Sequence, residues 1–173
     1  MKRLAVILLL LAACGKPSAE VKQYTIRSGN HYCTPREVRL LSESIRFEFY
    51  VDDTWRYEVD KQGINKICGI SDGENHMNNS IRLGWMDNNG TLEAYAYAYN
   101  GTGKHVAKKV CNITTGWHTA EVGMTADVYY VAVDGECQFI TRNNKSDIHM
   151  MLYPYFGGQC VAPHDINIKF KFQ

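Results

Sequence analysis

The sequence predicts an all-β domain built as an antiparallel β-sandwich or barrel. Short segments alternate apolar and polar residues, and turn signals separate them about every ten residues. No segment of the domain shows the 3.6-residue apolar period of an amphipathic helix. The clearest segment is 45–51, in which one face carries Ile45, Phe47, Phe49 and Val51 and the other carries Arg46, Glu48 and Tyr50. An apolar face on one side only suits a sheet that packs against a second sheet.

Strands are expected at 24–27, 45–51, 55–59, 64–70, 80–86, 91–99, 106–111, 117–122, 126–133, 137–141, 148–155 and 166–172. Asn89-Gly90 and Asp134-Gly135 predict tight hairpins because these residues accept the positive φ that such turns require. Alanines at 94, 96 and 98 alternate with tyrosines, which favours a strand over a helix at 91–99. Longer loops are expected at 71–79 and 156–163.

The first 14 residues predict export and lipid attachment. Met1-Lys2-Arg3 precedes an apolar run at 4–13, which is shorter than the about 20 residues of a membrane-spanning helix. Leu11-Ala12-Ala13-Cys14 resembles the lipobox of bacterial lipoproteins. The resemblance implies removal of residues 1–13, fatty acylation (palmitate or a similar chain) of Cys14 and a membrane anchor. Gly15 stands where an Asp is linked to inner-membrane retention, which favours the outer membrane. Residues 14–21 would be a flexible tether and 22–173 a single domain.

Charge and cysteine content narrow the functional classes. The 19 basic and 18 acidic residues are interspersed and give a net charge of +1, so nothing predicts nucleic-acid binding. Five cysteines follow Cys14, and disulfides are permitted in an exported domain. We expect a Cys137–Cys160 bridge, with Cys33–Cys160 as the alternative; Cys68 and Cys111 complete the set. Buried free thiols are equally compatible with the sequence, whereas the spacing does not suit zinc.

Tyrosines on one strand face are the first candidate site. Tyr95, Tyr97 and Tyr99 would share a face, where their rings could stack on sugars. Arg82, Glu93 and Glu48 would supply polar contacts, and Tyr50 and Trp55 could lie nearby. The alternative is that the tyrosines pack a core layer.

Two polar loops are further candidates. Residues 72–82 combine carboxylates, amides, His76 and Arg82, which could bind a ligand or calcium, although the spacing matches no known calcium loop. Residues 153–165 contain Gly157-Gly158 and His164-Asp165. Adjacent residues on a strand point to opposite faces, so His164 and Asp165 favour a structural role over a catalytic dyad.

A family resemblance rests on the segments 64–73, 80–85, 153–158 and 162–166. They look like secreted bacterial proteins of the concanavalin A-like lectin and glucanase jelly-roll type. The resemblance implies two stacked sheets with a concave face that binds or cleaves polysaccharide. Glu58-Val59-Asp60 lacks the second Glu of the glucanase pattern Glu-x-Asp-x-x-Glu, and the alginate lyase strings Gln-Ile-His and Tyr-x-Lys-x-Gly are absent.

The leading hypothesis is therefore carbohydrate binding without catalysis, and no catalytic residue, cofactor or metal site is assigned. An enzyme of the same fold is the first alternative. A lyase could use Tyr, His76 and Arg82, because elimination needs one base and charge neutralisation, whereas hydrolysis needs two carboxyls about 5 Å apart. An envelope module that binds another protein is the second alternative.

Overall fold

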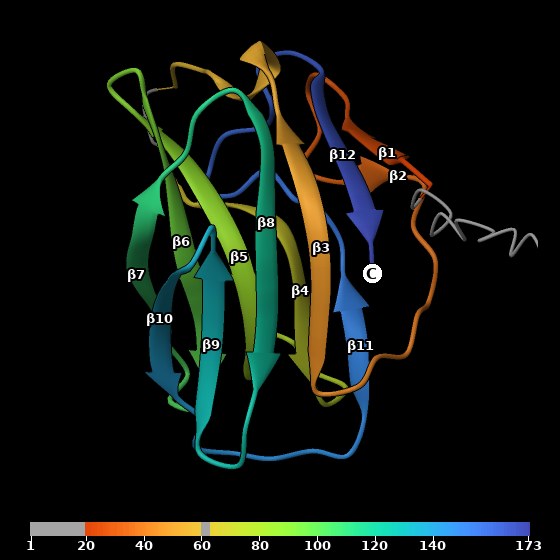
Figure 1. Ribbon diagram of the computed structural model, residues 1–173, viewed down its shortest axis with the longest axis vertical. Coiled ribbons are helices and arrows are strands. Elements are labelled where there is room, and N and C mark those ends of the chain that lie inside the picture. Colours follow the sequence, from red (N-terminus) through yellow and green to blue (C-terminus); the bar gives the residue numbers. More distant parts are fainter. Residues whose placement is uncertain (1–19, 60–62) are drawn as a thin grey trace, which may run out of the picture.

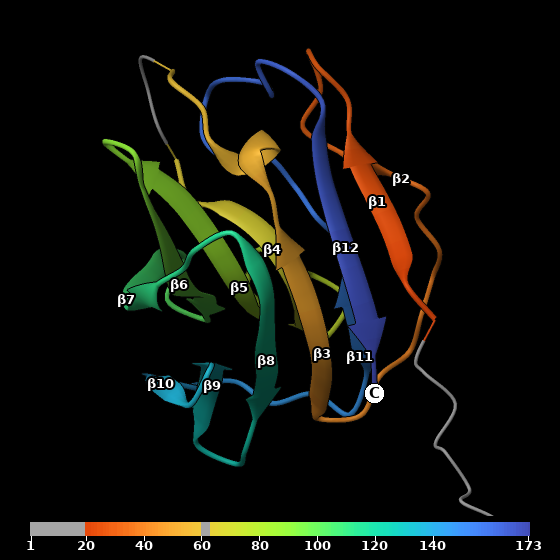
Figure 2. The same cartoon turned by 45° about the horizontal axis from the view of Figure 1, so that its top comes forward.

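A computed structural model describes residues 20–59 and 63–173, and they form two antiparallel β-sheets packed face to face (Figures 1 and 2). The seven-stranded sheet runs in the order β10 (Glu136–Thr141), β9 (Val128–Val133), β8 (Gly116–Met124), β3 (Ser44–Val51), β12 (Ile166–Phe172), β1 (Lys22–Ile26) and β2 (Cys33–Thr34). The five-stranded sheet runs β11 (His149–Leu152), β4 (Asn65–Asp72), β5 (Asn79–Asn88), β6 (Thr91–Asn100) and β7 (His105–Asn112). This confirms the expected antiparallel sandwich.

The core lies between the sheets and follows the predicted alternation. The inward residues of β3 and β6 are all buried: Ile45, Phe47, Phe49, Val51, Leu92, Ala94, Ala96 and Ala98. Trp55 and Trp85 meet near one end of the sandwich with ring centroids 4.9 Å apart. All the described strands and core residues lie between Glu20 and Gln173. Residues 20–173 therefore contain both sheets and the core between them.

The two expected hairpins are confirmed. Asn89 and Gly90 join β5 to β6 with φ of 52° and 82°, and Asp134 and Gly135 join β9 to β10 with φ of 48° and 93°. Two successive residues with positive φ give the turn whose twist matches that of paired antiparallel strands. The Asn89-Gly90 turn sets the pairing register of β5 with β6, in which Arg82 lies opposite Tyr97.

Residues 55–59 do not form the expected strand. A short 3-10 helix, η1 (Asp53–Trp55), occupies its start, and the carboxylate of Asp52 accepts a hydrogen bond from Thr54 N at 3.0 Å. Trp55 is fully buried and its Nε1 donates to the carbonyl of Asn167 at 2.8 Å. Burial of this ring and the cap by Asp52 therefore outweigh the local alternation. The short strand β2 was not expected from the sequence.

The expected disulfides are absent, because all five described cysteines are free. Cys137 lies on β10, at one edge of the seven-stranded sheet. The loop that carries Cys160 is bonded to the other end of that sheet, where Ala162 N donates to Asn30 O at 3.0 Å. Cys33 is fully buried in the core, as is Cys68. The alternative of buried free thiols therefore holds for Cys33 and Cys68.

The predicted signal segment 1–13 and Cys14 lie outside the described residues. Within residues 20–59 and 63–173, no helix is both long and apolar enough to cross a membrane.

Candidate functional site

A cleft of about 410 Å³ opens on the outer face of the five-stranded sheet. Its floor is made by Lys66 on β4, Arg82 on β5, and Tyr97 and Tyr99 on β6. Arg82 and Tyr97 are cross-strand partners, so their side chains emerge side by side. Their strand neighbours point the other way into the core, which is why a polar floor can lie directly above a buried apolar layer.

The walls of the cleft come from three segments far apart in the sequence. Residues 151–155, from the end of β11 and the loop after it, form one wall, where Tyr155 exchanges backbone hydrogen bonds of 2.8 and 2.9 Å with Lys66. Tyr32 and Arg36 come from the chain around β2, and Tyr32 bridges to Tyr155. His76 and Met77 contribute from the β4–β5 loop. The described cleft is therefore a product of the tertiary fold rather than of a single loop.

Aromatic rings run along the cleft in two groups. Tyr97 meets Tyr99 edge to face at 5.8 Å and stacks on His105 at 4.9 Å. In the wall of the cleft, Tyr155 meets Tyr32 edge to face at 5.1 Å and stacks on His31 at 5.3 Å. Such rings present apolar faces beside hydroxyl groups, which is the combination that a sugar ring requires.

Two buried cations lie between these aromatic groups. Lys66 and Arg82 are each only 8% exposed. The Lys66 ammonium lies 4.2 Å from the centre of the Tyr97 ring and donates to the Ile64 carbonyl at 2.6 Å. Burial, and then the charge of Arg82, lower the pKa of Lys66 to about 8. The structure therefore holds two like charges close together in a buried position.

Arg82 also carries an unsatisfied donor. Its Nε is buried and has no hydrogen-bond partner within the described ranges 20–59 and 63–173. Leaving a buried donor unpaired costs about 1–3 kcal/mol, and more when the group is charged. This unpaired donor therefore adds to the cost of holding Arg82 in its buried position.

Glycines make room for both cations. A Cβ at Gly69, the cross-strand partner of Arg82, would lie 2.6 Å from Arg82 Cγ and 2.3 Å from the Ile81 carbonyl oxygen. A Cβ at Gly157 would lie 2.9 Å from Lys66 Nζ. The Cβ at Gly157 would also lie 2.1 Å from the Ile64 carbonyl oxygen, so contacts with the backbone exclude a side chain at both glycines.

Four of the predicted ligand-binding residues meet in the cleft: Arg82, Tyr97, Tyr99 and His76. The predicted shared face of the β6 tyrosines is therefore correct, since their neighbours Ala96 and Ala98 are buried in the core.

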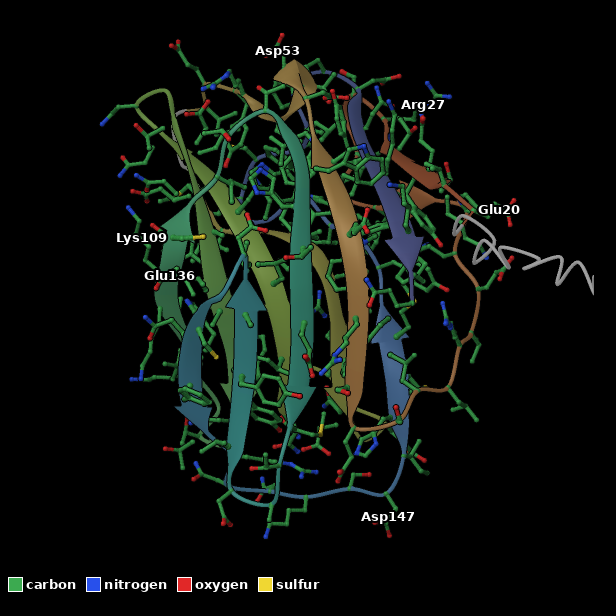
Figure 3. The ribbon with its side chains drawn as sticks, in the orientation of Figure 1. Glu20, Arg27, Asp53, Lys109, Glu136 and Asp147 are labelled. Carbon is green, nitrogen blue, oxygen red and sulfur yellow. The ribbon has the colours of Figure 1, made fainter. Side chains whose placement is uncertain are left out.

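Tyr95 and Glu93 share that strand face but lie outside the cleft lining. Tyr95 donates to the Glu93 carboxylate, and Lys109 on β7, marked in Figure 3, pairs with Glu93 at 2.6 Å. Hydrogen bonds from Lys109 and Tyr95 lower the pKa of Glu93. This carboxylate is therefore already neutralised by protein groups.

The placement of Glu48 near the tyrosines is wrong. Glu48 lies on β3, in the other sheet, where Lys171 pairs with it at 2.9 Å. Tyr50 is on the same strand and packs against Trp117 at 5.3 Å, while Trp55 is in the core. Alternation shows which residues of one strand share a face, but it does not show which sheet the strand joins.

Sequence reasoning missed Lys66, Tyr155, Tyr32 and Arg36 as site residues. Lys66 lies in the segment 64–70, whose pattern predicts a buried strand. A charged residue within such a strand was the one feature of the sequence that could have indicated a site residue. Tyr155 belongs to the loop 153–165 that was singled out, although for its glycines. Tyr32 and Arg36 carry no local signal, because only tertiary contacts bring them to the cleft.

Asp72, the first carboxylate of the predicted calcium stretch, is occupied by protein groups. It accepts hydrogen bonds from Tyr129 at 2.7 Å, from Arg142 at 2.7 and 2.8 Å, and from Ser146 N at 3.1 Å. Burial raises the pKa of this carboxyl, but the hydrogen bonds of Arg142 and Tyr129 outweigh it and lower the pKa overall. Asp72 therefore forms a buried ion pair with Arg142.

His164 and Asp165 contact different partners. His164 Nε2 hydrogen-bonds the Thr54 carbonyl at 2.9 Å, and the Asp165 carboxylate accepts from Ser28 N at 2.9 Å and pairs with Arg27. They join the last loop to η1 and to the end of β1, as expected for a structural role.

Comparison with known proteins gives similarity in structure but not in sequence. No protein-family model matches the chain, and no curated protein matches it in sequence. Among solved structures, a glycoside hydrolase family 16 endo-glucanase from Bacteroides ovatus superimposes with a TM-score of 0.58 at 9% identity, covering 91% of this chain and 81% of the glucanase.

Two further solved structures are similar to this chain in fold. The catalytic domain of an endo-1,3-β-glucanase (laminarinase) from Thermotoga petrophila gives a TM-score of 0.56 at 10% identity, with 91% and 76% of the two chains covered. An alginate lyase from Alteromonas sp. gives 0.54 at 12% identity, with 87% and 84% covered. The fold is a concanavalin A-like jelly roll. Identities this low establish the jelly roll alone, so the function has to be argued from the cleft.

Proposed function

We propose that this jelly-roll protein binds a polysaccharide in the cleft of the five-stranded sheet. The observation that carries the proposal is the joint presence of Tyr97, Tyr99 and Tyr155 with the buried Arg82 and Lys66 in one open cleft. Its volume of about 410 Å³ is in the ordinary range for ligand sites, roughly 300–1,000 Å³. The structural neighbours that act on glucans and alginate support a carbohydrate as the ligand.

Hydrolysis is not favoured by the cleft. Retaining glycosidases place two carboxyl groups about 5–5.5 Å apart, one as nucleophile and one as acid. The described residues that line the cleft include neither Asp nor Glu. Binding without cleavage therefore explains the residues of the cleft better than a glucanase activity does.

A polysaccharide lyase is the second candidate, favoured by one observation. Elimination needs a base and a cation that neutralises the sugar's negative charge, and the cleft holds His76 together with Arg82. Partial burial, and then the charge of Arg82, lower the pKa of His76, which favours the neutral imidazole that can accept a proton. Burial raises the pKa of Tyr97 and that of Tyr155, so neither phenol is prepared to act as the base.

The membrane anchor is the third part of the proposal. Leu11-Ala12-Ala13-Cys14 supports acylation of Cys14, and only residues 15–21 would separate the lipid from β1. The protein would thereby hold its cleft within a short distance of a bacterial membrane, with the outer membrane favoured. A role in binding another envelope protein remains the alternative if no glycan binds.

A glycan array tests the binding proposal. Residues 20–173, which contain the described sandwich, are probed against plant, algal, host and bacterial glycans. We expect a specific signal that Tyr97→Ala abolishes, because this ring forms part of the cleft floor. Trp117→Ala is the matched control, since Trp117 is an exposed aromatic residue of the opposite sheet. A signal lost with Trp117→Ala but kept with Tyr97→Ala would contradict the proposal. Release of unsaturated, ultraviolet-absorbing products from the bound glycan would select the lyase.

A further inference from the structure

The charges of the cleft are strongly one-sided. Lys66, Arg82 and Arg36 line it, and the described lining residues include no carboxylate. The whole chain is nearly neutral, with 19 basic and 18 acidic residues, so this imbalance is a local feature of the cleft. Elsewhere on the same sheet the protein does supply a counter-ion, as the Lys109–Glu93 pair shows.

The two inner cations are held at a cost to the free protein. Lys66 and Arg82 are each more than nine-tenths buried, and a buried charge without a partner is strongly unfavourable. Lys66 is partly compensated by the Ile64 carbonyl and by the Tyr97 ring. Arg82 Nε is buried without an acceptor in the described part of the chain. Gly69 and Gly157 keep this position open.

From this arrangement we infer that the cleft selects an acidic polysaccharide, whose negatively charged substituent is held by Arg82 and Lys66. The inference rests on the proposed glycan-binding function and specifies its ligand class. A carboxylate or sulfate oxygen would accept from the Arg82 guanidinium, and charge-assisted hydrogen bonds of this kind are among the strongest that proteins make. Tyr97 and Tyr155 lie beside Lys66, with its ammonium 4.2 and 5.9 Å from their ring centres, and would contact the sugar that carries the charge.

Paired ligands that differ only in charge test the inference without any mutation. The probes are oligogalacturonate and its carboxyl-reduced counterpart, together with a sulfated galactan oligomer and its desulfated form. Titration calorimetry with residues 20–173 should show at least about tenfold tighter binding of one charged member than of its neutral partner. Added salt should weaken the charged interaction only. The pair that responds tells whether a carboxylate or a sulfate is recognised.

Variants then assign the effect to the two cations. Arg82→Gln and Lys66→Gln should each weaken binding of the charged oligomer about tenfold or more. Lys104→Gln removes an exposed charge outside the cleft lining and should leave binding unchanged. Circular dichroism verifies that each variant is folded. If a variant is not folded, the comparison of charged and neutral oligomers with the wild-type protein still tests the inference.

Two results would overturn the inference. Equal binding of charged and neutral oligomers, lost with Tyr97→Ala but not with Arg82→Gln, would overturn selection by charge while keeping the glycan-binding function. No binding of any of the four oligomers would also overturn it, and the glycan array would then decide separately whether the glycan-binding function survives.

Discussion

Lys66 is a buried cation of the cleft, and its burial makes its charge sensitive to pH. Burial and the neighbouring Arg82 lower the pKa of Lys66 to about 8, while the rings of Tyr97 and Tyr155 lie close to the ammonium. Below this pKa Lys66 is charged and attracts a negative group, and above it Lys66 is neutral. The affinity of the cleft for a negatively charged ligand should therefore change within an experimentally accessible pH range.

The binding of an acidic oligosaccharide is accordingly expected to weaken as the pH rises through about 8. Titration calorimetry at about pH 7 and about pH 9 measures the change. In Lys66→Arg the guanidinium stays charged at both values, so the affinity should be nearly constant. An equal loss of affinity in both proteins would show that another group controls the pH dependence.

At the scale of elements, the buried pair of Asp72 and Arg142 holds the two sheets together. Asp72 ends β4 in the five-stranded sheet, whereas Tyr129 lies on β9 of the other sheet and Arg142 directly follows β10 of that sheet. The side chains of the ion pair are 0% and 3% exposed. Removing one partner of such a pair leaves a buried charge without compensation, which costs about 3–5 kcal/mol.

We therefore expect Asp72→Asn to lower the free energy of unfolding by about 3–5 kcal/mol in urea titrations. Asp127→Asn, which breaks the exposed pair with Lys145, should have little effect. The pKa of Asp72 is lowered in the folded state, so its stabilising contribution is complete above the unfolded value of about 3.9 and is lost as the pH falls below it. A variant as stable as the wild type at pH 7 would refute this account of the link between sheets.

The pairing of β4 with β5 also places Arg82. Gly69→Ala is expected to displace Arg82, because the new Cβ would meet Arg82 Cγ and the Ile81 carbonyl. Gly123→Ala crowds Tyr130 to a similar degree but lies in the other sheet. Both variants should lose stability, whereas only Gly69→Ala should weaken the binding of a charged oligosaccharide. Equal binding by the two variants would mean that Gly69 has no part in positioning Arg82.

At the scale of the whole molecule, we predict attachment to a membrane through Cys14. Cys14→Ser removes the thiol that would be acylated, so the protein should move from the membrane fraction to the soluble fraction. When cells are grown with radiolabelled fatty acid, this variant should not incorporate the label. Cys111→Ser removes a thiol of the domain and serves as the control. Labelling that persists in Cys14→Ser would exclude the proposed anchor.

The sequence was sufficient to predict the antiparallel sandwich and four residues that line the cleft, namely His76, Arg82, Tyr97 and Tyr99. Alternation in β6 predicted that Tyr97 and Tyr99 share a face, because the period of a strand depends only on local geometry. It did not predict that β3 joins the opposite sheet, which separates Glu48 from these tyrosines. Tyr32 and Tyr155 are 123 residues apart in the numbering and meet only through tertiary pairing. Contacts of this range leave no periodic signal in a single sequence.

The most direct test of the account is to locate a bound glycan on the folded domain. The amide signals of isotope-labelled residues 20–173 are recorded by NMR while the strongest ligand from the array is added. We predict that the largest shifts cluster at Lys66, Arg82, Tyr97 and Tyr155, on the outer face of the five-stranded sheet. A cluster of shifts on β3, β8 and β12 around Trp117, with the cleft residues unchanged, would contradict the central claim.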